Sequence, residues 1–589
     1  MANHSDPESC AMHREVHGEA LTGETTGQPL SREISESGMP TLCVKAEGNT
    51  EHGANRKPCT DPSRSETLRM SGSLLHGSWE ISSTPEEESM SGGTEKATSH
   101  NAVVNVDEKS DRSVLPGKLP NKAGAAEAME GRGLVKGNAG ESNTVRTQCR
   151  EVVSQGLRGV HEQARKDRHC RFTALLHHIT PTLLVTSFYE LKRNAAAGVD
   201  GVSWADYEGQ LYDRVHELHR EIHEGRYRAQ AVRRVHIPKA DGKLRPLGIA
   251  AVEDKVVQQA VVTVLSAIYE ADFMEFSYGF RPGRDQHMAL DALHRGLHQR
   301  RISWVVDADI KAYFDTVDHE WMVKFLAHRI ADRRMLRLIG KWLRADVMED
   351  GQLHNSRKGI PQGAVISPLL SNIYLHYVYD LWAQRWSKIH KTDVLLVRYA
   401  DDSIAGFECK GLANRFLRQL RERLACFGLE LHPDKTRMIE FGRFAAENRE
   451  RRGEGKPETF EFLGFTHCCG KSRKGWFEVL RRTSKTRMRK TLAALKEKLK
   501  YRSDEDVAQT GQWLKRFVQG YFNYHAIPGN LQRLNGFRKA VCTLWRGALL
   551  RRSHKHRLPW SKFGKLVDRF VPCCRLVHPW PARRTHVST

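Results

Sequence analysis

Two aspartates stand side by side at the centre of the stretch RYADDSIAGF, residues 398–407. Apolar residues dominate both flanks, with VLLV at 394–397 before the pair and IA at 404–405 after it. Two apolar runs around a short polar centre predict a buried β-hairpin that turns at Asp401 and Asp402. Because burying an unpaired carboxylate costs several kcal/mol, we expect positive charge to lie against this turn.

A further acidic residue, Asp309, follows the apolar stretch WVV at 304–306, which predicts another strand. If that strand neighbours the hairpin, three carboxylates converge, and their repulsion is tolerable only around cations. Carboxylate oxygens suit Mg²⁺, and two ions about 4 Å apart can clamp the attacking and leaving oxygens of a phosphoryl displacement. The alternative is a charged turn in solvent.

The charge of the chain is large and uneven. Its 589 residues carry a net +23, but residues 1–150 carry −6 and residues 151–589 carry +29. Such an excess over several hundred residues predicts a polyanionic partner, and nucleic acid fits better than a membrane surface. No run of about 18 uncharged apolar residues occurs, and no signal peptide is evident, so we expect a cytoplasmic protein with no membrane partner.

The cysteines do not predict a metal or disulfide framework. Twelve are present, and the close pairs among them are the adjacent ones, 468–469 and 573–574. No C-x2-C pair occurs, so free thiols in a reducing compartment are the favoured interpretation.

Composition and periodicity divide the chain. Residues 1–150 are rich in Ser, Thr, Gly and Glu, which predicts a disordered extension. Strands and helices are expected from Tyr227 onward, including a hairpin turning at Asp241-Gly242, one long helix after the loop KGIPQG, and a strand at FEFLGFTHC. The expected units are 1–150 (extension), 151–225 (basic helices), 226–470 (strands and helices), 481–570 (helices only) and 571–589 (tail).

Seven motifs in order resemble one family. They are IPKADGKLRPLGI, YGFRPGRDQHMALDAL, DADIKAYFDTVDHE, GIPQGAVISPLLSNIYL, VRYADDSIAGF, LELHPDKT and FEFLGF. Together they resemble the reverse transcriptases encoded by group II introns, and the block QGYFNYHAIPGN…FRKAVCTLWRGALLRRS is similar to their maturase domain. The resemblance spans roughly residues 140–589. It implies an α+β right-hand polymerase, with fingers and palm built on antiparallel sheet plus helices, followed by an all-helical thumb and maturase domain.

The resemblance implies roles for the acidic residues. Asp309 and Asp401 would hold two Mg²⁺ ions, with Asp402 adjacent. Asp307 precedes Asp309 by two, but Asp309 fits better because Phe314 then falls five residues on, where the family places the ring that packs under the sugar. Ordinary core packing is the alternative for Phe314.

The resemblance also implies contacts with substrates. Lys239 and Arg245 would reach the triphosphate of the dNTP, where cations offset developing charge. Gln362, beside the permissive Gly363, would meet the nucleotide and the template. Lys435 resembles the family lysine near the pyrophosphate, a candidate proton donor, with a helix-capping loop as its alternative. Arg281 is a candidate template contact.

An RNA-binding surface is expected in residues 481–570, where basic residues alternate with aromatic ones. The aromatic residues Trp513, Phe517, Trp545 and Phe563 fit ordinary core equally well, so the positive charge is the better signal. The candidate RNA contacts are Arg487, Lys490, Arg516, Arg551 and Arg552. The basic stretch at Arg165 and Lys166 is a second candidate surface.

The expected function is Mg²⁺-dependent RNA-templated DNA synthesis from dNTPs and a DNA primer, together with maturase binding of the group II intron RNA. The chain ends without the paired cysteines of the H-N-H endonuclease that many relatives add, so second-strand cleavage is not expected. One alternative is a splicing maturase that has lost polymerisation. Another is a retron or defence reverse transcriptase. A homodimer is compatible with the sequence, which does not determine the oligomeric state.

Overall fold

The computed structural model describes residues 143–238, 244–354, 358–472, 474–552 and 557–581. All of them fall in the unit formed by residues 115–589. Most of the extension expected at 1–150 lies outside the described residues, as do Lys239 and the expected turn at Asp241-Gly242. Helix α1, Asn143–Lys166, begins before the expected boundary at residue 150.

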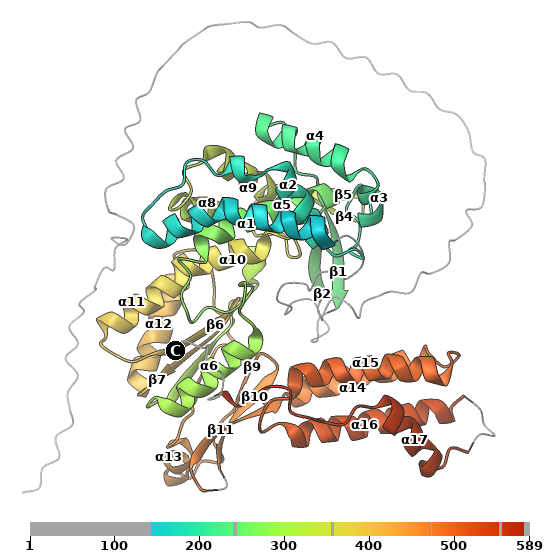
Figure 1. Cartoon of the computed structure of the whole chain (residues 1–589). Helices are drawn as coiled ribbons and strands as arrows, with labels where there is room; N and C mark the ends of the chain where they lie inside the picture. Colours follow the sequence, from blue (N-terminus) through green and yellow to red (C-terminus); the bar gives the residue numbers. More distant parts are fainter. Residues whose placement is uncertain (1–142, 239–243, 355–357, 473, 553–556, 582–589) are drawn as a thin grey trace, which may run out of the picture. The chain divides into compact units, whose positions relative to one another are not determined.

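Helices α2 (Pro181–Glu190), α3 (Trp204–Glu208) and α4 (Leu211–Glu224) precede the first strands (Figure 1). Their ends follow local sequence signals. Thr180 caps α2 ahead of Pro181, and Ser203 forms a capping box with Asp206 at α3. Helix α5, Val252–Tyr269, is buried on nearly every side, and α1, α2 and α10 pack against it.

A four-stranded sheet has the order β2-β1-β4-β5. The expected pair β1 (Val232–Pro238) and β2 (Leu244–Ile249) is confirmed as antiparallel. Two short strands that the sequence analysis did not anticipate, β4 (Val347–Glu349) and β5 (Gln352–His354), extend it, with β4 parallel to β1. A strand of only three residues is too short for an alternation of apolar and polar residues to be recognised in the sequence.

A second four-stranded sheet has the order β6-β7-β3-β8 (Figure 1). Its strands are β3 (Trp304–Ala308), β6 (Leu395–Tyr399), β7 (Asp402–Phe407) and β8 (Arg437–Glu440). Side chains alternate between two cores, as the two-residue period of a strand requires. Val305 and Ile404 pack with α6 (Gln286–Gln299), whereas Val306 and Ala405 belong to the core that includes α12 (Lys410–Ala425). This mixture of antiparallel sheet and helices confirms the α+β class.

Helices α7 (Tyr313–Thr316), α8 (His319–Ala327) and α9 (Arg333–Leu343) follow β3. The single long helix expected after KGIPQG is instead α10 (Ser367–Leu375), a π-helical turn (His376–Asp380) and α11 (Leu381–Ile389). A π-helical turn inserts one extra residue into the helical ladder, and such turns are frequent at functional sites. The apolar pattern runs on through the turn, which is why the sequence predicts one helix.

A three-stranded sheet, β11-β10-β9, follows α13 (Ala445–Arg451). The stretch FEFLGFTHC, expected as one strand, is a hairpin of β9 (Phe460–Phe462) and β10 (Phe465–Lys471), so that expectation was wrong. Its two turn residues, Leu463 and Gly464, have φ of +47° and +82°. Positive φ at both positions is the type I′ requirement that a two-residue hairpin imposes. Strand β11, Phe477–Thr483, completes the sheet.

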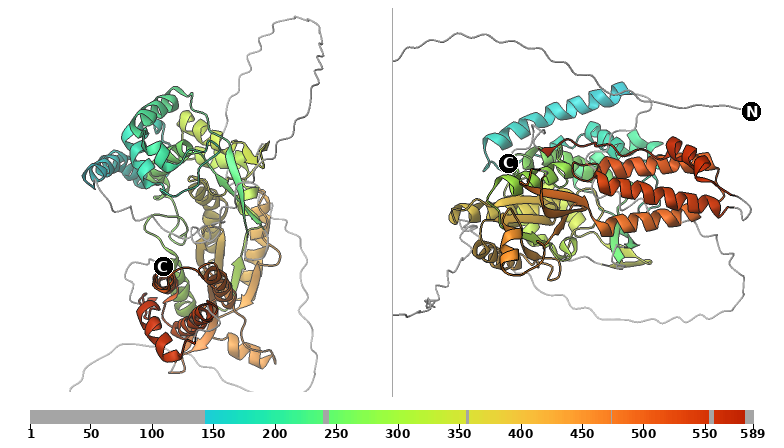
Figure 2. Two further views of the ribbon diagram at one scale, coloured as in Figure 1. Left: turned by 90° about the vertical axis from the view of Figure 1, so that its right-hand side faces the viewer. Right: turned by 90° about the horizontal axis from the view of Figure 1, so that it is seen from below.

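The described residues of the C-terminal part form four helices: α14 (Lys485–Lys500), α15 (Val507–His525), α16 (Leu531–Leu550) and α17 (Trp560–Phe570). The right-hand view of Figure 2 shows α14, α15 and α16 running alongside one another. Trp545 and Phe563 are 0% and 1% exposed, and Trp513 and Phe517 pack against the same core. The core interpretation of these four aromatic residues is therefore confirmed. Within the described residues, no helix is both long and apolar enough to span a membrane.

Candidate active site

The pairing of β3 with β7 brings the candidate carboxylates together. Ala308 lies opposite Ser403 in the antiparallel register, so Asp309 follows the last pair on one strand and Asp402 precedes it on the other. Tyr399 pairs with Asp402 in the β6–β7 hairpin, which leaves Ala400 and Asp401 as the turn. The hairpin predicted from RYADDSIAGF is confirmed, and it ends beside Asp309.

A loop before β8 holds Asp309 in place. The backbone N–H of His432 donates to the carbonyl oxygen of Asp309 at 2.8 Å. The hydroxyl of Thr436 lies 3.4 Å from the Asp309 nitrogen and accepts from it. Lys435, in the same loop, donates from Nζ to Oδ2 of Asp309 at 2.9 Å, with 61% of the lysine side chain exposed. The positive charge expected at this site is therefore supplied, for Asp309, by Lys435.

The carboxylates repel one another. The Asp402 side chain is exposed to solvent, yet protein surrounds it closely enough that desolvation is the main cause raising its pKa to about 7. The charges of Asp401, Asp309 and Asp307 contribute to this rise in pKa, and that of Arg487 opposes it. Burial likewise raises the pKa of Asp307 to about 6, against the opposing charge of Arg437.

The donor set fits a hard divalent cation in its chemistry. Carboxylate oxygens from Asp309, Asp401 and Asp402 are the ligands that Mg²⁺ prefers, and their crowding leaves negative charge to neutralise. In the described part of the chain, however, no three His, Cys, Asp or Glu side chains already form a metal-binding cluster. Asp309 is instead paired with Lys435, so ion binding requires these side chains to rearrange.

Phe314 lies in the turn after Asp309, half-buried on α7. Its carbonyl oxygen accepts from the N–H of Ile360 at 2.7 Å. Gly359 has φ of +90°, and a Cβ there would lie 2.9 Å from the same oxygen, so only glycine allows this approach. The loop that leads to Gln362 is thereby fastened to the turn that carries Phe314.

Gln362 and Arg245 belong to contacting segments. The N–H of Gly248, on β2, donates to the Gln362 carbonyl at 2.6 Å. Gly363 has φ of +106°, and a Cβ there would lie 2.8 Å from the oxygen of Gly248. Arg245 stands three residues before Gly248 on β2, and its side chain is half-buried. Two candidate nucleotide contacts from distant motifs thus lie on neighbouring backbone segments.

Arg281 is placed differently from the other candidates. Its guanidinium is 4% exposed and pairs with Glu270, with Nη2 2.9 Å from Oε2. It also donates to the carbonyl oxygens of Met274 and Ser277 at 2.8 and 2.9 Å. These contacts hold the 274–281 loop, and they favour a structural role over the template contact considered from sequence.

The candidate RNA contacts separate into three kinds. Arg487, at the start of α14, is exposed and lies near enough to Asp402 to lower its pKa. Lys490 and Arg516 are exposed on α14 and α15, and Arg551 is exposed directly after α16. Arg552 turns inward and donates to the carbonyl oxygens of Glu505 and Arg502 at 2.6 and 3.0 Å.

Sequence reasoning left Arg398 unassigned, although it stands next to the catalytic motif. An arginine inside an otherwise apolar strand was the signal available. In the structure it is 1% exposed and pairs with Asp380, which is 0% exposed. Asp380 lies in the π-helical turn that periodicity did not show.

Comparison with known proteins places this site in a family. Residues 237–467 match the family described as reverse transcriptase (RNA-dependent DNA polymerase). That range contains β3, the β6–β7 hairpin and the loop of Lys435, and so the whole carboxylate site.

Several curated proteins are similar to the chain. Protein YkfC of Escherichia coli (strain K12) is 33% identical over 355 residues, which cover 51% of this chain and 91% of that protein. Group II intron-encoded protein LtrA of Lactococcus lactis subsp. cremoris is 37% identical over 207 residues, or 35% of this chain and 34% of LtrA. Nuclear intron maturase 2, mitochondrial, of Arabidopsis thaliana is 28% identical over 110 residues, 18% of this chain and 15% of that protein.

The chain belongs to the reverse transcriptase family, among the group II intron-encoded reverse transcriptases/maturases. Its enzyme class is RNA-directed DNA polymerase. The chain spans about a third of the length of LtrA, so what LtrA does as a whole protein is not transferred by this match.

Proposed function

We propose that this protein copies its own group II intron RNA into DNA during retrohoming, and that it binds the same RNA as a maturase to assist splicing. The observation that carries the first half is the β3–β7 register, which sets Asp309 beside the Asp401–Asp402 turn. The second half is supported by the +29 charge of residues 151–589 and by the similarity to intron-encoded relatives.

In this proposal Asp309, Asp401 and Asp402 would hold two Mg²⁺ ions, which supply charge neutralisation at the attacking 3′-hydroxyl and at the leaving pyrophosphate. The protein's own task is to present the carboxylates at the edge of the sheet. Lys435 holds Asp309 by an ion pair at 2.9 Å and is mostly exposed. It can therefore leave Asp309 when the ions bind, and its ammonium is then available to donate a proton to pyrophosphate.

The substrate-facing residues act through position. Arg245, together with Lys239, would bind the triphosphate from the β1–β2 hairpin, and Gln362 would contact the base pair being formed. The hydrogen bond from Gly248 to Gln362 keeps the hairpin and the Gln362 loop together. Phe314, whose backbone is fastened to that loop through Ile360, would pack under the sugar and disfavour a 2′-hydroxyl.

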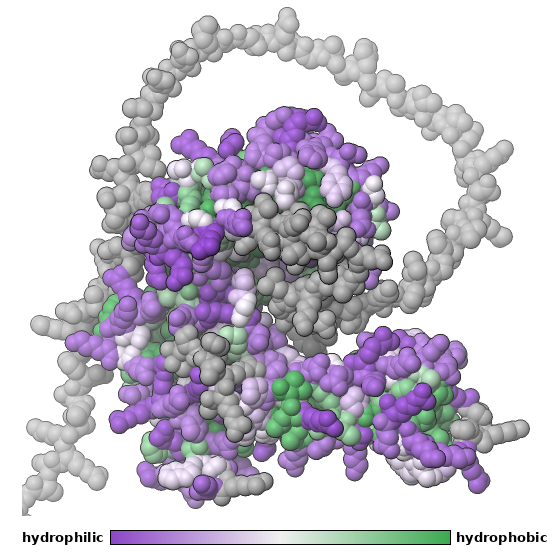
Figure 3. Space-filling view, viewed as in Figure 1, coloured by the Kyte–Doolittle hydropathy of each residue, from purple (hydrophilic) through white to green (hydrophobic). Residues whose placement is uncertain are grey.

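These roles assign the parts of a right-hand polymerase. The sheet β2-β1-β4-β5 with its helices would be the fingers, and the sheet β6-β7-β3-β8 the palm. Helices α14–α17 would be the thumb and maturase domain. Hydrophilic residues cover most of the face shown over these helices in Figure 3, which suits a surface that contacts phosphates.

RNA binding is proposed for the exposed cations Lys490, Arg516 and Arg551, with Arg165 and Lys166 of α1 as a second surface. Neutralising phosphates stabilises a folded RNA without chemistry by the protein, and it makes affinity fall steeply with salt. Arg487, near Asp402, is better placed to meet the primer or template at the active site.

Primer extension on an RNA template tests the polymerase proposal. Wild type should extend a DNA primer with dNTPs and Mg²⁺, and Asp401→Ala should not. Equal incorporation by both proteins would refute polymerisation at this site. If neither extends the primer while both promote splicing of the flanking intron, the protein is the splicing maturase without polymerase activity.

A further inference from the structure

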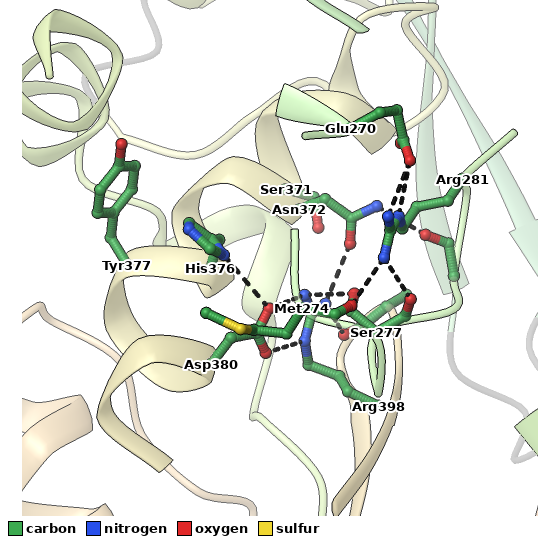
Figure 4. A network of polar contacts seen from close by, with 12 residues as sticks. Glu270, Met274, Ser277, Arg281, Ser371, Asn372, His376, Tyr377, Asp380 and Arg398 are labelled. Atoms are coloured by element: carbon green, nitrogen blue, oxygen red, sulfur yellow. Dashed lines mark hydrogen bonds and ion pairs between the residues drawn. The ribbon is translucent and has the colours of Figure 1, made fainter. Parts of the chain in front are cut away.

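One buried arginine uses every hydrogen-bond donor it has next to the catalytic turn (Figure 4). Arg398 Nε and Nη2 donate to the two carboxylate oxygens of Asp380, each at 2.6 Å. Nη2 also donates to Ser277 Oγ at 2.7 Å. Nη1 donates to Asn372 Oδ1 at 3.0 Å and to the carbonyl oxygen of Ala400 at 2.9 Å. A guanidinium has five N–H groups, and all five are engaged.

The last of these bonds reaches the catalytic turn itself. The carbonyl of Ala400 belongs to the peptide group that joins Ala400 to Asp401. Ala400 has φ of +56°, a left-handed conformation that a residue with a Cβ seldom adopts without support. Because a peptide group is planar, a bond that fixes the carbonyl of Ala400 also fixes the N–H and the starting direction of Asp401.

A second contact holds the preceding peptide of the turn, which joins Tyr399 to Ala400. Asn372, on α10, accepts from Arg398 and donates from Nδ2 to the carbonyl of Gly279 at 2.6 Å. Gly279 packs so closely on the turn that a Cβ there would lie 2.3 Å from the Ala400 nitrogen. The turn is thus held between the Arg398 guanidinium and the backbone of the 277–279 segment.

None of these five hydrogen bonds of Arg398 goes to the carboxylates of Asp309, Asp401 or Asp402. Asp380, 0% exposed, is the bidentate partner of Arg398. His376, whose Nδ1 lies 3.9 Å from Asp380, has its pKa lowered to about 4, chiefly by burial, and is neutral at pH 7. The contribution of Arg398 is therefore the planar fork geometry, which a lysine does not reproduce.

We propose that Arg398 is a positioning residue for DNA synthesis, which sets the Ala400–Asp401 peptide so that the Asp401 carboxylate faces the bound ions. The proposal rests on the proposed two-metal function of Asp401. It also gives the π-helical turn a role, since that turn places Asp380 against β6.

The test compares Arg398→Lys with Arg329→Lys. Arg329 is a matched control because it is 2% exposed and paired with a buried aspartate, Asp272, at 3.0 Å, but its other bonds go to the carbonyls of Asp167, Cys170 and Ala164. Ser277→Ala is the milder variant, which removes one acceptor and keeps the Arg398–Asp380 pair. Full-length proteins are assayed for thermal melting, for primer extension with dNTP titration, and for Mn²⁺ binding by electron paramagnetic resonance.

We expect Arg398→Lys to lower the turnover number at least tenfold per folded molecule, to leave the KM for dNTP within about twofold, and to weaken Mn²⁺ binding severalfold. Ser277→Ala should lower turnover about threefold. Arg329→Lys should melt earlier by a similar amount and keep its turnover and Mn²⁺ affinity.

The proposal is overturned if folded Arg398→Lys keeps wild-type turnover and Mn²⁺ binding. It is also overturned if Arg329→Lys loses both properties to the same degree, because the effect is then general loosening. If Arg398→Lys does not fold, Ser277→Ala decides alone. Asp401→Ala, assayed in parallel, distinguishes the two-metal proposal from the positioning proposal. If Asp401→Ala keeps activity, the two-metal proposal is refuted. If Asp401→Ala loses activity and Arg398→Lys keeps it, only the positioning role is refuted.

Discussion

The sheet β6-β7-β3-β8 and the helices α14–α17 handle charge in opposite ways. Around the sheet, charged groups lie inside, and Arg398 and Asp380 are 1% and 0% exposed and paired with each other. Among the described helices, the core is built on Leu514, Val518 and Trp545, each 0% exposed, and most basic side chains face outward. A carboxylate site needs a rigid polar support, whereas a surface that meets phosphates needs only accessible cations on an apolar frame.

The carboxylate side of the comparison is tested most strongly by Asp401→Ala. Removing one of the three proposed metal ligands should lower primer extension by on the order of 10³-fold, equivalent to about 4 kcal/mol of transition-state stabilisation. Binding of the intron RNA, measured by filter retention, should stay within about twofold because the helices are untouched. A parallel loss of RNA affinity would mean that the two regions are not functionally separate.

The apolar core of the helices α14–α17 is tested by Trp545→Ala. The indole is fully buried in the helical core, so its removal should lower the free energy of unfolding by about 3–5 kcal/mol. Urea unfolding followed by circular dichroism measures the loss, and RNA affinity should fall with the folded fraction. Truncation of the exposed Trp560 on α17, 62% exposed, is the matched control and should change stability by less than about 1 kcal/mol.

The stability of the folded state should depend on pH through His467, which is 0% exposed on β10. The pKa of His467 is lowered to about 3, chiefly by burial and also by the nearby charges of Arg481 and His294. Between about pH 3 and about pH 6.5 the imidazole of His467 binds a proton in the unfolded chain but not in the folded chain. The stability of the folded state therefore falls as pH drops from about 6.5 toward 3. The free energy of unfolding of His467→Phe minus that of wild type should be about 2 kcal/mol larger at pH 5 than at pH 7.

Urea titrations at both pH values measure this difference. His169→Phe, at an exposed position, provides the control and should show no such difference between the two pH values. Equal pH dependence of His467→Phe and wild type would show that His467 does not carry the acid sensitivity.

Arg552→Gln tests a basic side chain that points inward, unlike most basic side chains of the helices α14–α17. Losing its bonds to the carbonyls of Glu505 and Arg502 should lower the free energy of unfolding by about 1–3 kcal/mol. The slope of RNA affinity against salt should not change, because this guanidinium is bonded to the protein. A smaller slope with unchanged stability would place Arg552 on the RNA instead.

Arg516→Gln should have the opposite effect to Arg552→Gln: it should change the salt dependence of RNA binding and leave stability almost unchanged. Arg516 is exposed on α15, so stability should change by less than about 0.5 kcal/mol. The slope of log affinity against log salt should fall by about 0.7–0.9, as expected when the protein neutralises one phosphate fewer. A slope identical to that of wild type would remove Arg516 from the proposed RNA surface.

The sequence predicted local elements well where apolar spacing repeats. The β6–β7 hairpin and the β1–β2 pair follow directly from apolar runs separated by turn residues. It failed at FEFLGFTHC, where the left-handed turn at Leu463-Gly464 divides one apolar run into two strands. It also missed the π-helical turn at 376–380, because one extra residue in a helix leaves the apolar pattern almost unchanged.

By itself, the sequence determined which residue types were available and which local conformations they favour, since these depend on neighbours along the chain. It therefore supplied the aspartates of a metal-type site and the cations of a phosphate-type surface. Only the tertiary structure decided what each of them meets. The β3–β7 register sets Asp309 beside Asp402, and packing from four segments gives Arg398 its five hydrogen bonds. Arg551 and Arg552 are adjacent and identical in type, yet one faces solvent and the other bonds to the α14–α15 connection, because direction in space depends on contacts made far along the chain.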